Sequence, residues 1–259
     1  MKNTHRTSLF VFTTTMVFFY APLVVLIIYS FNNSKTMHWE GFSLRWYTEL
    51  FFHSNDLWKA FLNSVIIALS SSIVATAMGT LGAIGIYWYT FRFKKYVQIA
   101  SFLPLILPEI IIGVSLLVFF AATGMKLGLL TIFIAHASFN LPYVLLIVSS
   151  RLDEFDHSII EAAYDLGARE IDALLKVIIP VSMPGIIAAF LVSITLSLED
   201  FVITFFVAGP GSSTLPLHVY SMIRFGVSPV INALSVILIS ASILLAFSTK
   251  GLYKYILQK

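Results

Sequence analysis

Three carboxylates interrupt the long apolar stretches of this 259-residue sequence. Glu109 lies in LPLILPEIIIG, and Glu199 and Asp200 are adjacent in SLEDF. The chain is 58% hydrophobic and 11% charged, with a mean hydropathy of +0.91, which is typical of membrane proteins. A carboxylate at hydrocarbon depth costs about 2.5–3.5 kcal/mol on insertion scales, so such a group indicates a functional site. The chemistry that carboxylates offer at that depth is the attraction of a cation.

Two prolines, Pro104 and Pro108, precede Glu109, which falls midway along its apolar stretch. Each proline removes a backbone donor, so the carbonyl groups around Ala100 and Pro104 lose their helical partners. Such an interruption is tolerated at membrane depth where it faces protein or a wet cavity. Carbonyl groups beside a carboxylate predict an ammonium site that includes Glu109. The alternative is a proline kink in which Glu109 hydrogen-bonds to a neighbouring helix.

Glu199 and Asp200 are neighbours, and adjacent residues of a helix face different directions. In a continuous helix Asp200 shares one polar stripe with residues spaced by three or four positions, namely Ser193, Ser197 and Thr204. Glu199 is flanked on its own face by Thr195, Val202 and Phe206. We therefore assign Asp200 to a cation pathway and keep Glu199 as a second pathway residue. The alternatives for Glu199 are contact with a partner subunit or a protonated, uncharged carboxyl group.

His136, Asn140 and Tyr143 also recur at helical spacing and form one polar face. An aromatic face such as that of Tyr143 attracts cations, so this face is a candidate lining for the same pathway. Polar residues in membrane helices also serve as hydrogen-bonding groups between helices, which is the alternative for Asn140 and its neighbours.

The apolar stretches that position these residues predict an all-α polytopic membrane protein. A span needs about 20 apolar residues, and in hydrocarbon only a helix pairs every backbone group within such a segment. Six candidate spans are predicted, at about Leu9–Ser30, Phe61–Tyr89, Val97–Ala122, Leu127–Ser150, Ser182–Ala208 and Ile231–Phe247. The first is expected to stay as an anchor, because it is long for a signal peptide and no A-x-A-like cleavage site follows it.

The distribution of basic residues predicts the orientation of these spans. With both termini in the cytoplasm, 11 of the 16 Lys and Arg residues fall on the inner face, as the positive-inside rule requires. The net charge of +3 largely reflects this bias, so it indicates an anionic lipid leaflet rather than nucleic acid as the charged partner.

The sequence lacks the residues that several kinds of functional site require. There is no Cys for disulfide or thiol chemistry, and the six His show no metal-ligand spacing. The sequence also lacks a G-x-x-x-x-G-K-[ST] phosphate loop, so we expect no ATP site and no catalytic activity in this chain. No separate soluble domain is apparent, and residues 1–259 are predicted to form a single transmembrane domain.

One polar segment, residues 151–180, contrasts with the rest of the chain and includes EAAYDLGAREIDALLKVIIP. Ser158 with Glu161 makes an S-x-x-E capping box, and Gly167 is expected to end or turn that helix. A second helix is predicted from about Ala168, with i,i+4 ion pairs Asp165–Arg169 and Asp172–Lys176, until Pro180 and Pro184 break it. From spacing alone, this helix-turn-helix could equally be a solvated connector.

This segment resembles the cytoplasmic EAA loop of permease subunits in ATP-binding-cassette (ABC) importers. The matching residues are Glu161, Ala162, Ala163, Gly167 and Pro180. The resemblance implies a type I importer permease fold in which the loop is a coupling helix seated on a separate ATPase subunit. The two alanines would permit close approach, Gly167 would turn the chain, and charges such as Asp165 and Arg169 would orient the docking.

The resemblance extends over essentially the whole chain and is strongest to permeases of spermidine/putrescine importers. It is carried by FNNS, SFNLPYVLLIVSSRL, TLSLEDFVITFFVAGPG and LPLHVYSMIRFGVSPVINAL. It implies a bacterial inner-membrane subunit that imports polyamines by alternating access. The implied partners are a second permease, two ATPase subunits that bind ATP and Mg²⁺, and a periplasmic polyamine-binding protein.

Two other functions are consistent with parts of this pattern. One is an importer permease for another solute, such as an amino acid, ferric ion or an anion. An anion would favour Lys or Arg at membrane depth, whereas every Lys and Arg here falls in a loop or at a helix end. The other is an ion-coupled secondary transporter, but such proteins usually contain repeated halves, and no internal repeat is apparent.

Overall fold

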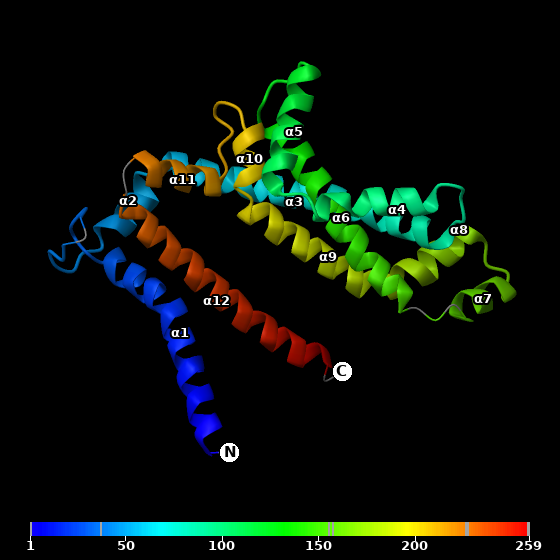
Figure 1. The fold of residues 1–259 in the computed structure, drawn as a ribbon, viewed down its shortest axis with the longest axis horizontal. Coiled ribbons are helices and arrows are strands. Elements are labelled where there is room, and N and C mark those ends of the chain that lie inside the picture. Colours follow the sequence, from blue (N-terminus) through cyan, green and yellow to red (C-terminus); the bar gives the residue numbers. More distant parts are fainter. Residues whose placement is uncertain (1, 37, 155, 157, 226–227, 258–259) are drawn as a thin grey trace. The chain divides into compact units, whose positions relative to one another are not determined.

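Figure 1 shows a computed structural model of the chain, which describes residues 2–36, 38–154, 156, 158–225 and 228–257. Every regular element among these residues is a helix, and one isolated antiparallel bridge joins Asn32 to Phe42. The elements are α1 (Lys2–Ser30), α2 (Arg45–Phe52), α3 (Asn55–Trp88), α4 (Lys94–Phe102), the 3₁₀ turn η1 (Leu103–Leu105), α5 (Glu109–Ala122), α6 (Leu129–Asp153), α7 (Ser158–Asp165), α8 (Glu170–Ala173), the π-helix η2 (Leu174–Ile178), α9 (Ile179–Glu199), α10 (Val202–Val207), α11 (Leu215–Phe225) and α12 (Val230–Leu257).

The helical class is confirmed, and most of the predicted spans correspond to long apolar helices. Among the described residues, four helices are long and apolar enough to cross a membrane, namely Thr7–Ser30, Asn55–Trp88, Leu129–Asp153 and Glu170–Glu199. A bent pair, Lys94–Leu105 with Glu109–Ala122, makes a fifth span if it crosses as one unit. The last predicted span corresponds to α12, whose described apolar stretch is the shorter segment Val230–Leu244. A total of six spans therefore stays a prediction.

The predicted third span, Val97–Ala122, is interrupted more sharply than a kink. Helix α4 ends at Phe102, the turn η1 follows, and α5 begins at Glu109 after a bend of 107°. The two prolines explain the bend, because each lacks the N–H group that a continuous helix needs for its hydrogen bonds. The predicted interruption is confirmed, but Glu109 begins a new helix instead of lying midway along one.

The predicted fifth span, Ser182–Ala208, is wrong at both ends. At its C-terminal end α9 stops at Glu199, the backbone of Asp200 is extended with φ −63° and ψ 121°, and α10 begins at Val202. The prediction that a continuous helix carries Asp200 on one polar stripe is therefore wrong, because the helix ends before Asp200. The four members of the stripe are nevertheless all buried, so they still face the interior on both sides of the break: Ser193, Ser197, Asp200 and Thr204.

At its N-terminal end the predicted fifth span continues through Pro180 and Pro184, the two prolines that were expected to break the helix. Helices α8 and α9 join through the five-residue π-helix η2, and Pro180 lies in the first turn of α9. A π-helix bonds each residue to one five positions away, so this wider turn changes the bonding pattern where Pro180 has no N–H to give. The second half of the polar segment is therefore the start of the long helix α9.

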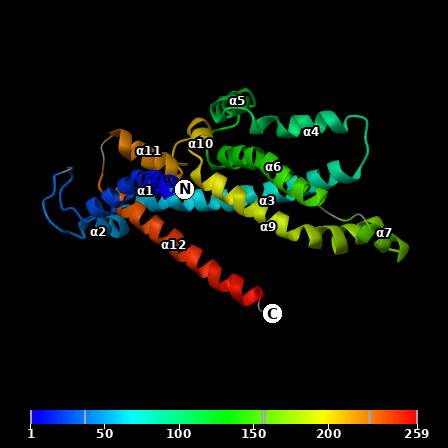
Figure 2. The same cartoon turned by 60° about the horizontal axis from the view of Figure 1, so that its bottom comes forward.

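Residues 57–218 form one compact unit that contains the three carboxylates. In this unit α6 packs along α9, and α10 packs against both α5 and α6 (Figure 2). Two buried clusters hold it together, one centred on Val148 and Ala189 and the other on Phe120, Ile132 and Ile203.

Gly113 lets α5 approach α10 closely. A Cβ atom at this position would lie 2.7 Å from the ring of Phe206, a distance that real Cβ contacts do not show. Because Gly113 is one turn after Glu109 in the same helix, this contact holds the start of α5 beside α10.

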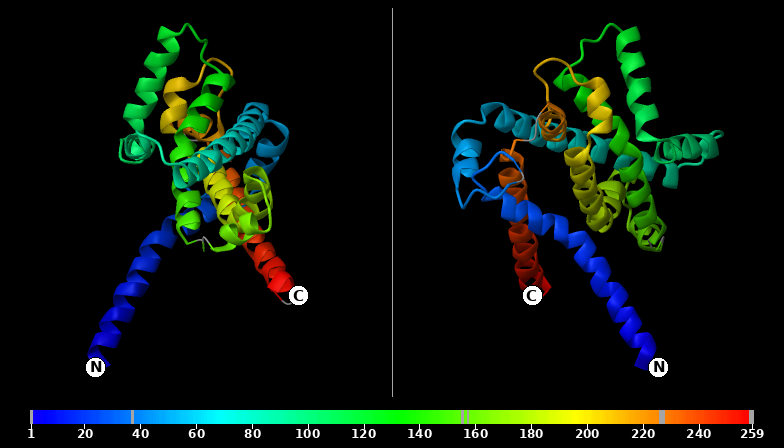
Figure 3. Two further views of the ribbon diagram at one scale, coloured as in Figure 1. Left: turned by 90° about the vertical axis from the view of Figure 1, so that its right-hand side faces the viewer. Right: turned by 60° about the vertical axis from the view of Figure 1, so that its left-hand side comes forward.

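Residues 1–56 and 219–259 form the other unit, in which α12 packs against α1 and α2. Figure 3 shows α1 in blue and α12 in red, close together near α2 and diverging toward the two termini. The loop between α1 and α2 folds around Asn32, whose side chain donates to the His38 carbonyl at 2.8 Å and accepts from the Glu40 N–H at 3.0 Å. Trp46 Nε1 donates to the Asn32 carbonyl at 2.6 Å.

Candidate functional site

A cavity of about 280 Å³ lies at the two helix interruptions. It is lined by Glu109, Phe139, Leu196, Glu199, Asp200, Phe201 and Val202. All of these residues belong to the compact unit 57–218, and they come from the start of α5, the middle of α6 and the break between α9 and α10. The structure therefore brings together the three carboxylates that the sequence singled out.

The side chains of Glu109 and Glu199 are exposed in this single chain and border the cavity. Among the residues that the structure describes, no basic side chain forms an ion pair with either carboxylate. Glu109 also lies in the first turn of α5, where the helix dipole favours negative charge. These two groups are available to a positively charged ligand.

Asp200 is in a different environment, although it borders the same cavity. Its side chain is buried, and its carboxylate accepts hydrogen bonds from the Ile203 N–H at 3.2 Å and the Thr204 N–H at 2.9 Å. The Thr204 hydroxyl donates to Asp200 Oδ2 at 2.8 Å. The carboxylate thus replaces the missing helical carbonyl partners at the start of α10, and this exchange is what stabilises the break after Glu199.

His136 on α6 joins this network from the opposite side. Its Nε2 lies 3.1 Å from Asp200 Oδ2 and 2.9 Å from Thr204 Oγ1, and its Nδ1 lies 2.6 Å from Ser197 Oγ. The imidazole is 1% exposed, so these are buried contacts in which each lost partner is costly. His136 therefore ties α6 to the ends of both α9 and α10.

The other two predicted pathway residues on α6 lie in different positions. Asn140 is fully buried and its amide donates to the Ser193 carbonyl at 3.3 Å, which is the interhelical role considered as its alternative. Tyr143 is half-buried, packs against Phe139 with ring centroids 5.4 Å apart, and interacts electrostatically with Glu109. Of the two, only Tyr143 is associated with groups that line the cavity.

Sequence reasoning missed the aromatic side chains of the cavity, Phe139 and Phe201. Phe139 lies one residue before Asn140, on a helix rich in apolar residues, so its spacing carries no separate signal. Phe201 enters the cavity wall because the helix breaks at Asp200, and a pattern that assumes a continuous helix places it elsewhere.

The polar segment after α6 forms the short helix α7, whose end is confirmed. Gly167 has φ +83°, its N–H donates to the Tyr164 carbonyl at 2.9 Å, and the Ala168 N–H donates to the Ala163 carbonyl at 3.0 Å. This pair of bonds is a Schellman motif, which favours glycine at the left-handed position. Glu161, Ala162 and Ala163 lie on the helix that it terminates.

Two details of the predicted segment are wrong. Ser158 is the first helical residue and not its cap, because the Asp156 carboxylate accepts a hydrogen bond from the Ser158 N–H at 2.9 Å. Arg169 pairs with Asp172 at 3.1 Å and not with Asp165, because Gly167 turns the chain between Asp165 and Arg169. The Asp172–Lys176 pair is confirmed at 2.8 Å.

Helix α7 and the residues after it present apolar side chains outward, while one side chain of α7 is buried. Ile160 is buried against the cluster that contains Val148, whereas Leu166 is 89% exposed. The polar segment 151–180 has three other exposed apolar side chains: Ile159, Ile171 and Leu175. An exposed apolar surface beside charged groups is typical of a site that another protein covers.

A hydrogen bond joins this segment to the end of α3. The Tyr89 hydroxyl donates to the Glu170 carboxylate, and this bond raises the pKa of Tyr89 above its ordinary value. The phenol is therefore protonated at neutral pH and holds the start of α8 to the residue that follows α3.

Comparison with known proteins places these features in a family. Residues 75–259 match the family described as "Binding-protein-dependent transport system inner membrane component". The chain is 39% identical over 239 residues to the spermidine/putrescine transport system permease protein PotC of Escherichia coli K12, covering 92% of this chain and 90% of PotC. It is 41% identical over 232 residues to the putrescine transport system permease protein PotI of the same organism, covering 86% and 82%.

Solved structures support the same fold at low sequence identity. A chain of a bacterial ABC transporter involved in import of the acidic polysaccharide alginate superposes with a TM-score of 0.73 at 14% identity, covering 96% of both chains. A chain of the MetNI methionine ABC transporter in an inward-facing conformation gives a TM-score of 0.57 at 18% identity, covering 74% of this chain and 90% of that one.

Proposed function

Because the chain belongs to the family of binding-protein-dependent transport system inner membrane components, we propose that it is a permease subunit of an ATP-driven importer of polyamines. Relatives named for spermidine and putrescine transport match most of its length. The observation that carries the substrate assignment is the acidic cavity, which Glu109 and Glu199 line. Among the residues that the structure describes, no basic side chain forms an ion pair with either carboxylate. An acidic cavity suits a polyamine cation and opposes an anion.

Within this proposal the side chains of the cavity have separate roles. Glu109 and Glu199 attract an ammonium group, and Phe139 and Phe201 offer ring faces and apolar surface to the methylene chain. Asp200 also lines the cavity, so we keep it as a pathway residue, and its hydrogen bonds hold the break that presents Glu199 and Phe201. The attraction is weak and transient, because a site that held the cation tightly would slow its release.

The membrane arrangement that we propose is the six-span, type I importer permease fold, with both termini in the cytoplasm. The bent pair α4–α5 supplies one span and α12 another, while α1 exposes its apolar side chains where lipid or a partner would cover them. In bacteria this places the chain in the inner membrane, which agrees with the description of its family.

The proposed partner at the cytoplasmic face is an ATPase chain, which binds ATP and Mg²⁺ and meets α7 and the turn after it. Glu161, Ala162, Ala163, Gly167 and the charges around Asp165 and Arg169 form this coupling surface. Its exposed Leu166 and Ile159 supply apolar contact area. A second permease, a second ATPase subunit and a periplasmic polyamine-binding protein complete the proposed importer, which works by alternating access.

Co-purification and transport test this function together. The tagged chain should isolate with a cassette ATPase, and proteoliposomes of the complex should accumulate labelled putrescine only when ATP is hydrolysed and the binding protein is present. Accumulation by the chain without an ATPase would instead identify a secondary transporter. Accumulation of an amino acid or ferric ion in preference to putrescine would retain the importer and refute the polyamine assignment.

A further inference from the structure

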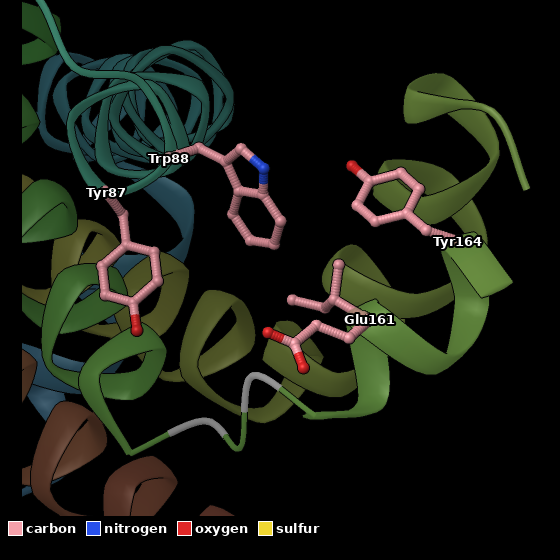
Figure 4. A pocket seen from close by; sticks show the side chains of 5 residues that line it. Tyr87, Trp88, Glu161 and Tyr164 are labelled. Carbon is pink, nitrogen blue, oxygen red and sulfur yellow. The ribbon is translucent and has the colours of Figure 1, made fainter.

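A second cavity, of about 240 Å³, lies between the end of α3 and the coupling helix α7. It is lined by Tyr87, Trp88, Ile160, Glu161 and Tyr164, all within the compact unit 57–218. Figure 4 shows the Trp88 indole and the Tyr164 ring on opposite sides, with the Glu161 carboxylate directed toward the end of α3. This cavity is separate from the acidic cavity of the pathway, with which it shares no lining residue.

The lining combines three aromatic rings with one carboxylate. The centroids of the Tyr87 and Trp88 rings are 6.2 Å apart and their planes are inclined by 51°, so the two rings form a corner. Tyr164 supplies the third ring from α7. Aromatic faces attract an ammonium group through their quadrupoles, and cages of this kind recognise amine cations in other proteins.

The charges around this cavity favour a cation. Among the described residues no basic side chain pairs with Glu161, and Asp153 adds a negative charge that acts on Tyr87. Lys94 contacts one lining residue through the backbone, because its Nζ donates to the Tyr87 carbonyl at 3.4 Å. Glu170, at the start of α8, accepts a hydrogen bond from the Tyr89 hydroxyl.

We propose that this aromatic cage binds the ammonium end of a polyamine on the cytoplasmic side and so links α7 to the end of α3. The proposal rests on the proposed function for the choice of amine and for the side of the membrane. A bound cation would contact Trp88 on one helix and Glu161 and Tyr164 on the other. Occupancy would hold the coupling helix in one position, so accumulated product would slow further import.

Binding to the assembled importer tests this site directly. The complex, in lipid nanodiscs and without the binding protein, carries Glu109→Gln and Glu199→Gln so that pathway binding is weakened. Equilibrium dialysis with labelled putrescine should then show saturable binding that 1,4-butanediol does not displace. Trp88→Leu and Tyr164→Leu should each weaken this binding about fivefold, the size expected for one cation–π contact. Trp58→Leu, on the same helix as Trp88 but outside the cage, should leave it unchanged.

The opposite results overturn the proposal. They are an absence of saturable binding, an affinity in both cage variants equal to that of the complex with the intact cage, or displacement by the uncharged diol. Binding that occurs only after the ATPase subunits are removed would show that a basic side chain of the ATPase fills the cage instead. Because Tyr164 is 40% exposed on a surface helix, its variant provides a test even if Trp88→Leu fails to fold. This dialysis does not depend on import, so a failure of the transport function is detected separately.

Discussion

Removal of charge from either of the two adjacent carboxylates at the end of α9 should lower uptake, but only the change at Asp200 should also lower stability. Asp200 accepts three hydrogen bonds from the start of α10, two on Oδ2 from Thr204 and one on Oδ1 from Ile203. In Asp200→Asn the single amide oxygen satisfies Thr204, and the NH₂ group then faces the Ile203 N–H. One buried donor loses its partner, which costs about 1–3 kcal/mol.

The measurement is thermal unfolding of the purified complex, paired with uptake at limiting putrescine. Asp200→Asn should lower the melting temperature by about 2–4 °C for each kcal/mol lost, and uptake should fall with it. Glu199 is exposed and forms no ion pair with any basic side chain that the structure describes. Glu199→Gln should therefore lower uptake and leave the melting temperature unchanged. A fully stable Asp200→Asn, or a destabilised Glu199→Gln, would refute this division of roles.

Three further substitutions test the packing and coupling features. Gly113→Val should destabilise the complex by about 1–3 kcal/mol, because a Cβ would meet Phe206 at 2.7 Å, and an unchanged melting temperature would contradict that packing. Gly167→Ala forces alanine into φ +83°, at a cost of about 1–2 kcal/mol, and should reduce ATPase co-purification; full recovery of ATPase would exclude the turn from coupling. Tyr89→Phe removes the bond to Glu170 and should reduce the ATP hydrolysis that the binding protein stimulates. The raised pKa of Tyr89 means that the hydroxyl keeps its proton, and so this bond, until the pH rises through that higher value. Equal ATP hydrolysis by variant and wild type at neutral pH would therefore contradict a role for the Tyr89–Glu170 bond in coupling.

The sequence predicted the features that depend on local backbone chemistry. Pro104 and Pro108 predicted the interruption before Glu109, since a residue without an N–H group has the same effect in any context. Gly167 predicted the end of α7 for a similar reason, because glycine adopts the left-handed conformation at low cost. The polar face on α6 was also visible, and His136 and Asn140 do bond across to the α9–α10 region.

The break at Asp200 could not be predicted in this way, because it depends on a tertiary contact. No proline or glycine marks it, and the carboxylate that replaces the lost helical bonds is itself held by His136, 64 positions earlier in the chain. The passage of α9 through Pro180 was hidden for a related reason, since a π-helix leaves no pattern in the residue types. The break at Asp200 is the feature that adjoins the acidic cavity, which Glu199, Asp200 and Phe201 line.

Uptake by the Glu109→Gln/Glu199→Gln importer tests the central claim most directly. In proteoliposomes with ATP, the binding protein and limiting labelled putrescine, the double variant should assemble with its ATPase and melt at the same temperature as the wild type. Its initial uptake rate should be at least about fivefold lower, the effect of about 1 kcal/mol of lost attraction between a cation and the two carboxylates. A Glu49→Gln control, which alters an exposed carboxylate on α2, should transport normally. Wild-type uptake by the double variant would contradict the claim that a polyamine cation passes through the cavity between Glu109 and Glu199.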